Sequence, residues 1–246
     1  MKHYLDNKVS SLIEDNTYSN LKNYFKGEKC VVFGCGPSLN DYEASFVKQK
    51  LHDHYFLCIK QAFYKYKDRC NIHFINDNNM IHYAYSDNQM IVTSCGNKRF
   101  PFQALLSKEP SFHFTIDDTN GYLGSITKTN NFHSNELKPS FESIWGPGIM
   151  IETVIPFIVH SGFSDVKMLG WDYTDQRRTV LPHYYSNNLR SKFKNPASPE
   201  PSYLMPDLIK SSDHLFNYFR MKNINVEILT DKSFVSSKFQ RRILRG

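Results

Sequence analysis

Short apolar runs alternate with longer amphipathic stretches along most of this chain. Apolar runs bounded by polar residues predict strands, and apolar residues spaced three to four apart predict helices. The predicted strands are 31–33, 55–59, 72–75, 90–93, 166–169 and 226–229, with a weaker run at 112–116, and the predicted helices are 39–50, 150–161 and 208–222. Because apolar strands and helices alternate, we expect an α/β fold, a Rossmann-like and mostly parallel sheet with helices on both faces.

In a sheet of this kind, ligands bind beyond the carboxyl ends of the strands. The predicted strands end in polar or glycine-containing segments, namely residues 34–38, 60–61, 76–77, 170–173 and 230–233. These segments, which bring Lys60 and Asn76 to one edge of the sheet, are therefore the first candidates for a binding site.

The first strand runs into Gly34-Cys35-Gly36-Pro37-Ser38, a tight turn that leads into a helix. Glycines allow close backbone approach, and proline suits the first turn of a helix. Free N–H groups at a helix start favour anions, so this turn predicts a nucleotide phosphate. An ordinary strand-to-helix turn is the alternative. If the turn cradles phosphate, Gly36→Val is expected to abolish nucleotide binding while the fold survives.

A second glycine-containing constellation surrounds the strand at 166–169. Gly146-Pro147-Gly148 opens an apolar helix, which predicts another anion or ribose contact. Gly170-Trp171-Asp172-Tyr173 ends the strand, where Gly170 permits close approach and Asp172 offers acceptors for sugar hydroxyls or a base amine. Alternatively, Asp172 caps a following turn.

The periodicity also predicts the organisation of the chain. We expect an N-terminal helical extension over 1–28, one nucleotide-sugar binding domain formed by 29–173 and 208–233, and a basic tail over 234–246. Residues 174–207 lack periodicity and contain five prolines, which favours a lid or acceptor segment. The tail interleaves basic and apolar residues, so it is either a membrane-surface segment or a frayed end.

Composition narrows the class of protein further. The chain has 246 residues, 40% of them hydrophobic, and a net charge of +6, which suits an anionic ligand or membrane surface but does not favour nucleic acid. The five cysteines include no CxxC pair, and no HExxH or DxD pattern occurs, so we expect no metal and no other cofactor. The N-terminus lacks the apolar core of a signal peptide, which predicts a cytoplasmic protein. The sequence leaves open whether it is a homo-oligomer.

At this point the motifs resemble a known family. Gly34 to Leu39 looks like the GxGPSL motif of the small bacterial sialyltransferases of glycosyltransferase family 42. In the same order, residues 57–64, 74–76, 148–163, 169–173 and 215–233 are similar to later segments of that family. The resemblance implies a metal-independent, inverting transfer of an acidic sugar, sialic acid or a related ulosonic acid, from a CMP donor to a glycan or lipid-linked glycan.

The resemblance also implies roles for residues. The phosphate would lie near Gly36 and Ser38, Asn76 and residues 146–148 would contact the nucleotide, and Gly170, Asp172 and Tyr173 would hold cytidine or ribose. This chain departs from the family at Cys35 and Lys60, where the family has asparagines, and at Gly146-Pro147-Gly148, where it has Thr-Ser-Gly. The family's lid tyrosines fall near Thr174 and Val180, and its general-base histidine falls at Pro206.

Other residues offer the missing chemistry. Arg177 and Arg178 suit a departing phosphate, Lys60 places a charge at a strand end, and His183 is the candidate general base because an unperturbed histidine titrates near neutrality. Solvated arginines and a packing histidine are the alternatives. Two other functions stay open, a pterin-type diphosphokinase using ATP and Mg²⁺ and a non-catalytic nucleotide-sugar binding protein. For a transferase we expect peripheral attachment to the inner face of the membrane.

Overall fold

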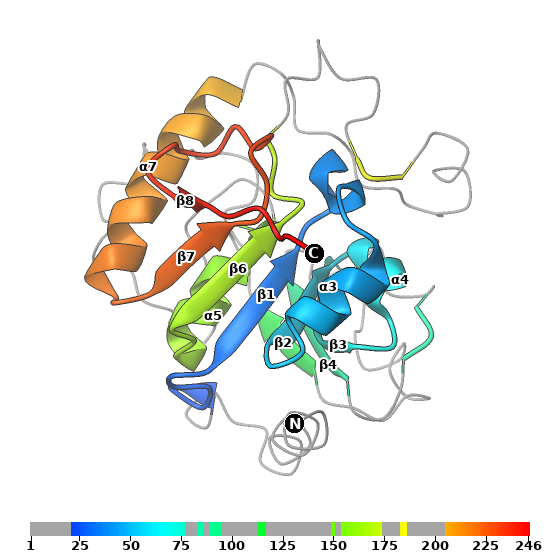
Figure 1. Ribbon diagram of the computed structural model, residues 1–246. Coiled ribbons are helices and arrows are strands. Elements are labelled where there is room, and N and C mark those ends of the chain that lie inside the picture. Colours follow the sequence, from blue (N-terminus) through cyan, green and yellow to red (C-terminus); the bar gives the residue numbers. More distant parts are fainter. Residues whose placement is uncertain are drawn as a thin grey trace.

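A computed structural model describes residues 21–76, 83–85, 89–94, 113–116, 149–150, 154–173, 183–185 and 205–246. Eight parallel strands form one sheet in the order β5-β4-β3-β2-β1-β6-β7-β8 (Figure 1). The strands are β1 (Lys29–Phe33), β2 (Tyr55–Ile59), β3 (Cys70–Asn76), β4 (Met90–Ser94), β5 (His113–Ile116), β6 (Asp165–Leu169), β7 (Asn225–Ile228) and β8 (Gln240–Arg241). The helices are the 3-10 turn η1 (Pro37–Asn40), α3 (Ala44–Lys50), α4 (Ala62–Tyr66), α5 (Ile155–Ser161) and α7 (Met205–Met221).

The strand order reverses direction at β1. From β1 the chain builds outward through β2, β3, β4 and β5, and it then returns to place β6 on the other side of β1. The two strands pair in register from Lys29↔Asp165 to Phe33↔Leu169. In α/β sheets, ligands bind beyond the carboxyl ends of the strands at such a switch point, and we call this region of the protein the crevice.

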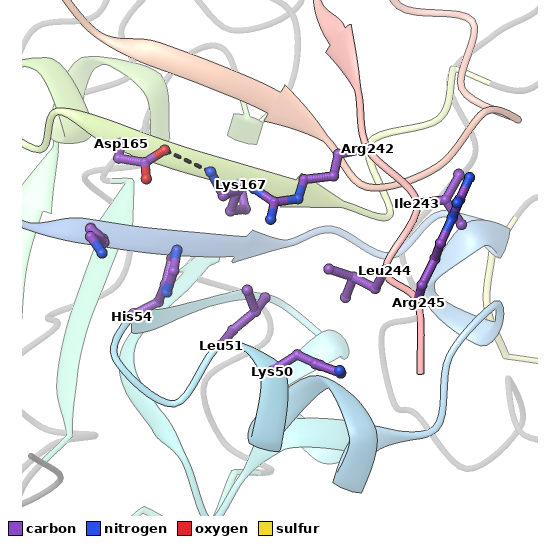
Figure 2. Close-up of a pocket in the computed structure, with 10 residues that line it drawn as sticks. Lys50, Leu51, His54, Asp165, Lys167, Arg242, Ile243, Leu244 and Arg245 are labelled. Atoms are coloured by element: carbon purple, nitrogen blue, oxygen red, sulfur yellow. Dashed lines mark hydrogen bonds and ion pairs between the residues drawn. The ribbon is translucent and has the colours of Figure 1, made fainter.

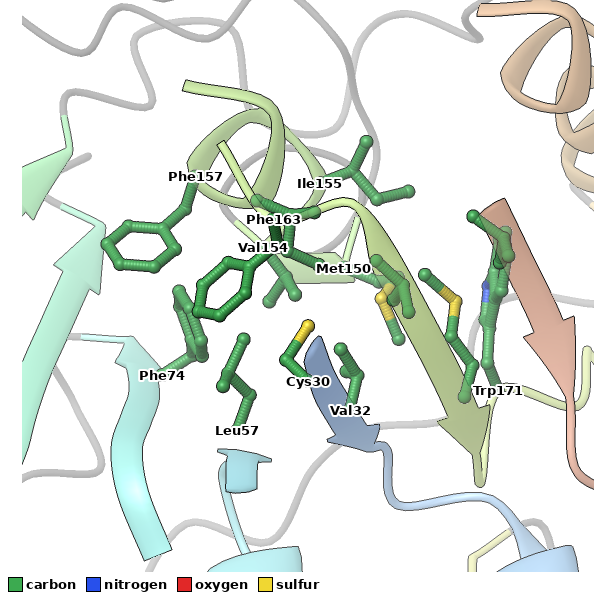
Figure 3. Close-up of a cluster of buried hydrophobic side chains, with 14 of the residues drawn as sticks. Cys30, Val32, Leu57, Phe74, Met150, Val154, Ile155, Phe157, Phe163 and Trp171 are labelled. Atoms are coloured by element: carbon green, nitrogen blue, oxygen red, sulfur yellow. The ribbon is translucent and has the colours of Figure 1, made fainter. Parts of the chain in front are cut away.

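Alternating side chains of the central strands fill two separate cores. Cys30 and Val32 point toward α5 and α7 in one hydrophobic cluster, where they lie below Val154 and Phe157 (Figure 3). Val31 and Phe33 belong to a second cluster on the side of α3 and α4. Because the sheet buries both faces, its strands are continuously apolar, and this is why the sequence predicts them well.

The expected fold class is confirmed, with differences at the helices. All seven apolar runs form strands of one parallel sheet. The helix expected over 39–50 is instead two elements, η1 and α3, separated by residues 41–43. The expectation did not include α4, which has five residues, or β8, which has two, because elements this short carry little periodicity.

Both ends of the described chain pack onto the sheet. Leu21 and Phe25 are buried in the α5-side cluster, and the Phe25 N–H donates to the Ser161 carbonyl at 2.7 Å. At the other end, β8 pairs with β7, and Val235 and Phe239 are buried. The alternative of a frayed C-terminal tail is therefore wrong, because residues 234–241 are part of the folded domain.

Candidate functional site

The loops after β1 and β6 approach each other closely at the switch point. The Gly34 N–H donates to the Leu169 carbonyl and the Gly36 N–H to the Gly170 carbonyl, both at 2.8 Å, so the β1–β6 ladder continues past the strands. A Cβ on Gly34 would lie 2.4 Å from the Gly170 carbonyl oxygen, and a Cβ on Gly170 would lie 2.4 Å from that of Gly34. Gly170 also has φ +81°, a conformation that favours glycine. These glycines let two loops of the protein meet.

Gly36 is also packed against other residues of the protein, so its lack of a side chain is needed for the fold. Its added Cβ would lie 2.4 Å from Oδ2 of Asp172 and 2.7 Å from the Gly170 carbonyl oxygen. A valine at this position would push these loops apart. The expectation that Gly36→Val leaves the fold intact is therefore wrong, and that variant does not isolate ligand binding.

Ser38 and Asp172, which the sequence nominates separately, form one hydrogen-bonded unit. The Ser38 N–H donates to Asp172 Oδ2 at 2.8 Å, its hydroxyl donates to Oδ1 at 2.6 Å, and the Gly170 N–H donates to the Ser38 hydroxyl at 3.0 Å. Both residues are buried, and burial raises the pKa of Asp172 against the opposing effect of the Ser38 hydrogen bonds. A ligand phosphate at this helix start would have to displace the carboxylate or bind beside it.

The Asp172 carboxylate caps the earlier η1 through the Ser38 N–H. The alternative that it caps a following turn stays a prediction, because residues 174–182 lie outside the described residues. The Asp172 backbone carbonyl accepts from the Phe234 N–H at 2.7 Å, and the Ser233 hydroxyl donates to the Trp171 carbonyl at 2.6 Å. The segment after β7 thus fixes the loop after β6. This long-range support joins residues more than sixty positions apart and leaves no sequence signal.

Residues 183–185 lie over the first glycine loop. The Tyr184 N–H donates to the Cys35 carbonyl at 2.8 Å, and its hydroxyl donates to the Gln61 carbonyl at 2.6 Å. Asn40 donates to the Tyr184 carbonyl at 2.5 Å. His183 is half-buried, with its ring stacked on Tyr185 at a centroid distance of 5.1 Å. The candidate base and the loop of Cys35 are therefore neighbours.

Cys35 contributes a neutral thiol at this position. Its Sγ lies 3.3 Å from the Ile59 carbonyl, to which it donates. Burial raises its pKa to about 11. Since only the thiolate is a good nucleophile, Cys35 links the first loop to the end of β2 rather than attacking a substrate.

Two other candidate residues occupy unusual backbone conformations. Lys60 and Tyr173 have φ of +45° and +46°, and the remaining non-glycine residues with positive φ among those described, Asn23 and Asn223, are of a type that tolerates it. Lys60 follows β2, and Tyr173 follows the loop after β6. Non-glycine residues with left-handed backbone conformations cluster at functional sites, where the surrounding structure holds them.

A buried histidine of β3 holds the backbone of Lys60 in place. His73 Nε2 lies 2.8 Å from the Lys60 carbonyl, and its Nδ1 lies 2.7 Å from the Tyr85 hydroxyl. Burial lowers the pKa of His73 to about 3, so the ring is neutral, donating from Nε2 and accepting at Nδ1. Phe63 stacks on the ring at 4.5 Å. The position of His73 within an apolar strand does not predict its hydrogen bond to the Lys60 carbonyl.

The structure says less about the other site residues that the sequence predicts. Asn76 ends β3, one of the strands that reach this edge of the sheet. Gly146, Pro147, Gly148, Arg177 and Arg178 lie outside the described residues, so their roles stay predictions. Within the described ranges, no group of three His, Cys, Asp or Glu side chains is placed to hold a metal, and no helix has the length and apolar character to cross a membrane.

No family model and no curated protein matches this sequence. Solved structures do match. The Maf glycosyltransferase from Magnetospirillum magneticum AMB-1 aligns with 99% of this chain at 12% identity and a TM-score of 0.53, and the chain spans 38% of that protein's length. The monofunctional α-2,3-sialyltransferase Cst-I from Campylobacter jejuni aligns with 84% of this chain and 77% of its own at 15% identity and a TM-score of 0.49. A mammalian sialyltransferase aligns with 92% and 79%, at 11% identity and a TM-score of 0.48.

The class that these observations define is a protein with a glycosyltransferase-type Rossmann-like fold. At 12% identity the likeness to the Maf glycosyltransferase shows the fold alone. The expected glycosyltransferase-type fold is confirmed at that level. Sialyltransferases are also among the matching structures.

Proposed function

We propose that this protein is a glycosyltransferase that moves sialic acid or a related ulosonic acid from a CMP-activated donor to a glycan or lipid-linked glycan. The observation that carries this proposal is the topological switch point between β1 and β6. There the chain combines a glycosyltransferase-type fold with most of the described candidate residues. The ordered motif resemblance supplies the donor class.

The donor is proposed to lie beyond β1 and β6, with the carboxyl end of β2 beside it. Each Asp172 oxygen accepts one bond from Ser38 and keeps a further lone pair for a nucleoside donor group. Lys60 follows β2 and Tyr173 follows the loop after β6, both in left-handed backbone conformations that are rare for residues with side chains. The leaving phosphate is assigned to Lys60, Arg177 and Arg178, because guanidinium and ammonium groups stabilise developing negative charge.

The proposed reaction is a single displacement. The acceptor hydroxyl oxygen bonds to the anomeric carbon as the bond from that carbon to the CMP phosphate oxygen breaks, and His183 takes the hydroxyl proton. One displacement inverts the anomeric configuration. We propose no metal, with the charge on CMP met by basic side chains instead.

A transfer assay with CMP-sugars and a panel of glycan acceptors tests the proposal. His183→Ala should lower turnover about 10²- to 10⁴-fold, the usual contribution of a general base, with little change in donor affinity. His52→Ala is the matched control, at an exposed histidine whose Nδ1 lies 3.1 Å from the Gln49 carbonyl. Full activity in His183→Ala removes that residue from the mechanism.

Two further arms separate the alternatives. Activity should survive EDTA, and a strict requirement for Mg²⁺ with ATP would instead identify a diphosphokinase. CMP-sugar binding without transfer to any acceptor would identify a non-catalytic binding protein.

We also propose that the protein works on the cytoplasmic face of the membrane, attached through its C-terminal segment. Phe234 is 47% exposed there, beside a run of basic residues. Deleting residues 234–246 would remove β8 and the buried Phe239, so a point variant is the sharper test. Phe234→Ser should weaken binding to anionic vesicles, whereas Met221→Ser, at a 54% exposed residue on α7, should not. Equal binding by both variants and the wild type would refute the attachment.

A further inference from the structure

A second candidate site lies on the α3 face of the sheet, away from the crevice. After β8 the chain turns back across this face, where the Arg242 N–H donates to the Ile228 carbonyl at 2.9 Å and the Leu244 N–H donates to the Tyr42 hydroxyl at 3.1 Å. Between this segment, the end of α3 and the first halves of β1 and β6 is a groove of about 500 Å³, which we call the tail groove. Figure 2 shows Arg242 to Arg245 on one side and Lys50, Leu51 and His54 on the other.

The tail groove is rich in positive charge. Its lining includes five basic side chains and His54 but a single carboxylate, and these residues are Lys29, Lys50, Lys167, Arg242, Arg245 and Asp165. Three of the basic groups are matched by carboxylates, since Lys167 bonds Asp165 at 2.8 Å and Glu227 at 2.7 Å, Arg242 lies 3.4 Å from Glu227, and Lys29 bonds Asp53 at 2.9 Å.

The other two cations have no such match. Lys50 lies over the Phe46 ring at 5.5 Å, and neither Lys50 nor Arg245 forms an ion pair with a residue that the structure describes. Both side chains are exposed at the edge of the groove. They therefore leave a net positive charge that no carboxylate of the described residues neutralises.

His54 gives an independent sign of a missing partner. It lines the groove and is 5% exposed, yet its Nε2 is fully buried with no hydrogen-bond partner among the described residues. Its Nδ1 lies 2.8 Å from Asp53. Burial raises the pKa of Asp53, but hydrogen bonds from Lys29 and His54 outweigh this and lower it to about 2. Because Asp53 is ionised, Nδ1 must carry a proton, and Nε2 is the free position.

An anionic oxygen at Nε2 would satisfy both observations. Burial lowers the pKa of His54, partly offset by Asp53, so the ring lacks its second proton at neutral pH. A neighbouring anion would favour that proton and receive a charge-assisted hydrogen bond from Nε2. Arginine and lysine at the edge suit a tetrahedral oxyanion, and the volume suits a small polar group with a short apolar part against Leu51 and Leu244.

We propose that the tail groove is a binding site for a phosphate-bearing group, separate from the crevice between β1 and β6. The shared chemistry is a phosphate monoester or diphosphate, carried either by a free metabolite or by a phospholipid head group. This inference does not depend on the proposed transferase activity, because none of its residues belongs to the crevice.

Titration calorimetry of the full chain with pyrophosphate at low salt tests the site. Lys50→Glu and Arg245→Glu should each weaken pyrophosphate binding about tenfold or more, because each removes a charged contact and adds a repulsive one. Lys22→Glu is the matched control, since Lys22 is also exposed and belongs to the segment packed against α5. An equal loss in Lys22→Glu would show general charge attraction and overturn the proposal.

Nitrogen NMR of the histidines gives a readout that does not rely on a variant. Pyrophosphate should shift the His54 Nε2 resonance toward that of a protonated ring, while His52 stays unchanged. Unmoved His54 resonances at saturating pyrophosphate and phosphatidic acid would overturn the site. If pyrophosphate acts and anionic vesicles do not compete, the ligand is a free phosphate compound. If phosphatidic acid vesicles alone act, and Lys50→Glu weakens them more than Lys22→Glu, the ligand is a lipid head group.

Discussion

The crevice at the carboxyl ends of the strands and the tail groove are two candidate sites built from different kinds of contact. At the crevice, Gly34 and Gly170 bring two backbones to within contact, and a buried Ser38–Asp172 pair joins them. The tail groove is built from long basic side chains, and two of them are exposed with no ion-pair partner among the described residues. The first region depends on shape and buried hydrogen bonds, and the second depends on charge.

This difference predicts how each region responds to substitution. Close backbone contact leaves no room for even one methyl group, so changes in the crevice should lower the stability of the fold. Exposed cations contribute little to the free energy of unfolding. Changes in the groove should therefore alter ligand binding and leave the stability of the fold intact. The following variants test that contrast.

The largest effect is expected from Gly170→Ala. The new Cβ would lie 2.4 Å from the Gly34 carbonyl oxygen in a residue with φ +81°. We expect a loss of more than about 4 kcal/mol in the free energy of unfolding, measured by urea denaturation, because backbone cannot move aside cheaply.

Gly27→Ala is a matched control for backbone conformation. Gly27 also has φ +81°, but a Cβ there meets nothing within 4 Å. It should cost about 1 kcal/mol, the strain of a left-handed alanine. The difference between the two variants measures the contact between the β1 and β6 loops, and equal losses would show that this contact is unimportant.

Ser38→Ala should have the next largest effect. It removes the hydroxyl that donates to Asp172 and accepts from the Gly170 N–H, leaving a buried carboxylate and a buried N–H each one partner short. We expect a loss of about 1–3 kcal/mol in urea denaturation. Ser161→Ala, a buried serine whose hydroxyl donates to the Phe157 carbonyl, should lose less because that acceptor is neutral. Similar losses in the two variants would argue against an ionised Asp172 carboxylate as the acceptor of the Ser38 hydroxyl.

His73 predicts how stability changes with pH. Its folded pKa of about 3 lies below the ordinary value of 6.5, so as the pH falls below 6.5 the unfolded chain binds a proton that the folded protein excludes. The associated stability is complete above pH 6.5 and is lost toward pH 3, with a slope of up to about 1.4 kcal/mol per pH unit. The buried His54 acts in the same direction.

His73→Gln keeps a donor for the Lys60 carbonyl and an acceptor for Tyr85 but removes the titrating ring. Urea denaturation gives the free energy of unfolding at each pH. Between pH 6 and 4.5, its slope against pH should be smaller in this variant, corresponding to about one proton fewer taken up on unfolding. Parallel slopes would mean that His73 is protonated without cost, and that Lys60 is held in some other way.

The sequence was a good guide to the fold because its information is local. Apolar runs such as 55–59 and 166–169 mark strands buried on both faces, and their alternation with helices implies a parallel sheet. The switch at β1 required knowledge of which strands are neighbours, and no local pattern supplies that. The five-residue α4 and two-residue β8 were missed for lack of a full period.

The sequence was a partial guide to the candidate site. Gly34, Gly36, Ser38, Gly170 and Asp172 were nominated one strand end at a time, and the structure brings all five together. Their partnership was not predictable, because Ser38 and Asp172 lie 134 positions apart. Their binding roles stay predictions. The support from His73 and Ser233, and the tail groove, arise from contacts between distant segments.

The smallest effect on stability is expected from Lys50→Glu, which completes the contrast with Gly170→Ala. Lys50 is exposed at the end of α3, and its described contact is with the Phe46 ring. Reversing the charge there should change the free energy of unfolding by no more than about 0.5–1 kcal/mol. The wild type should also lose pyrophosphate affinity as salt rises, more steeply than Lys50→Glu, because fewer charges then attract the ligand. A large loss of stability in Lys50→Glu would mean that the groove, like the crevice, is a structural element of the fold.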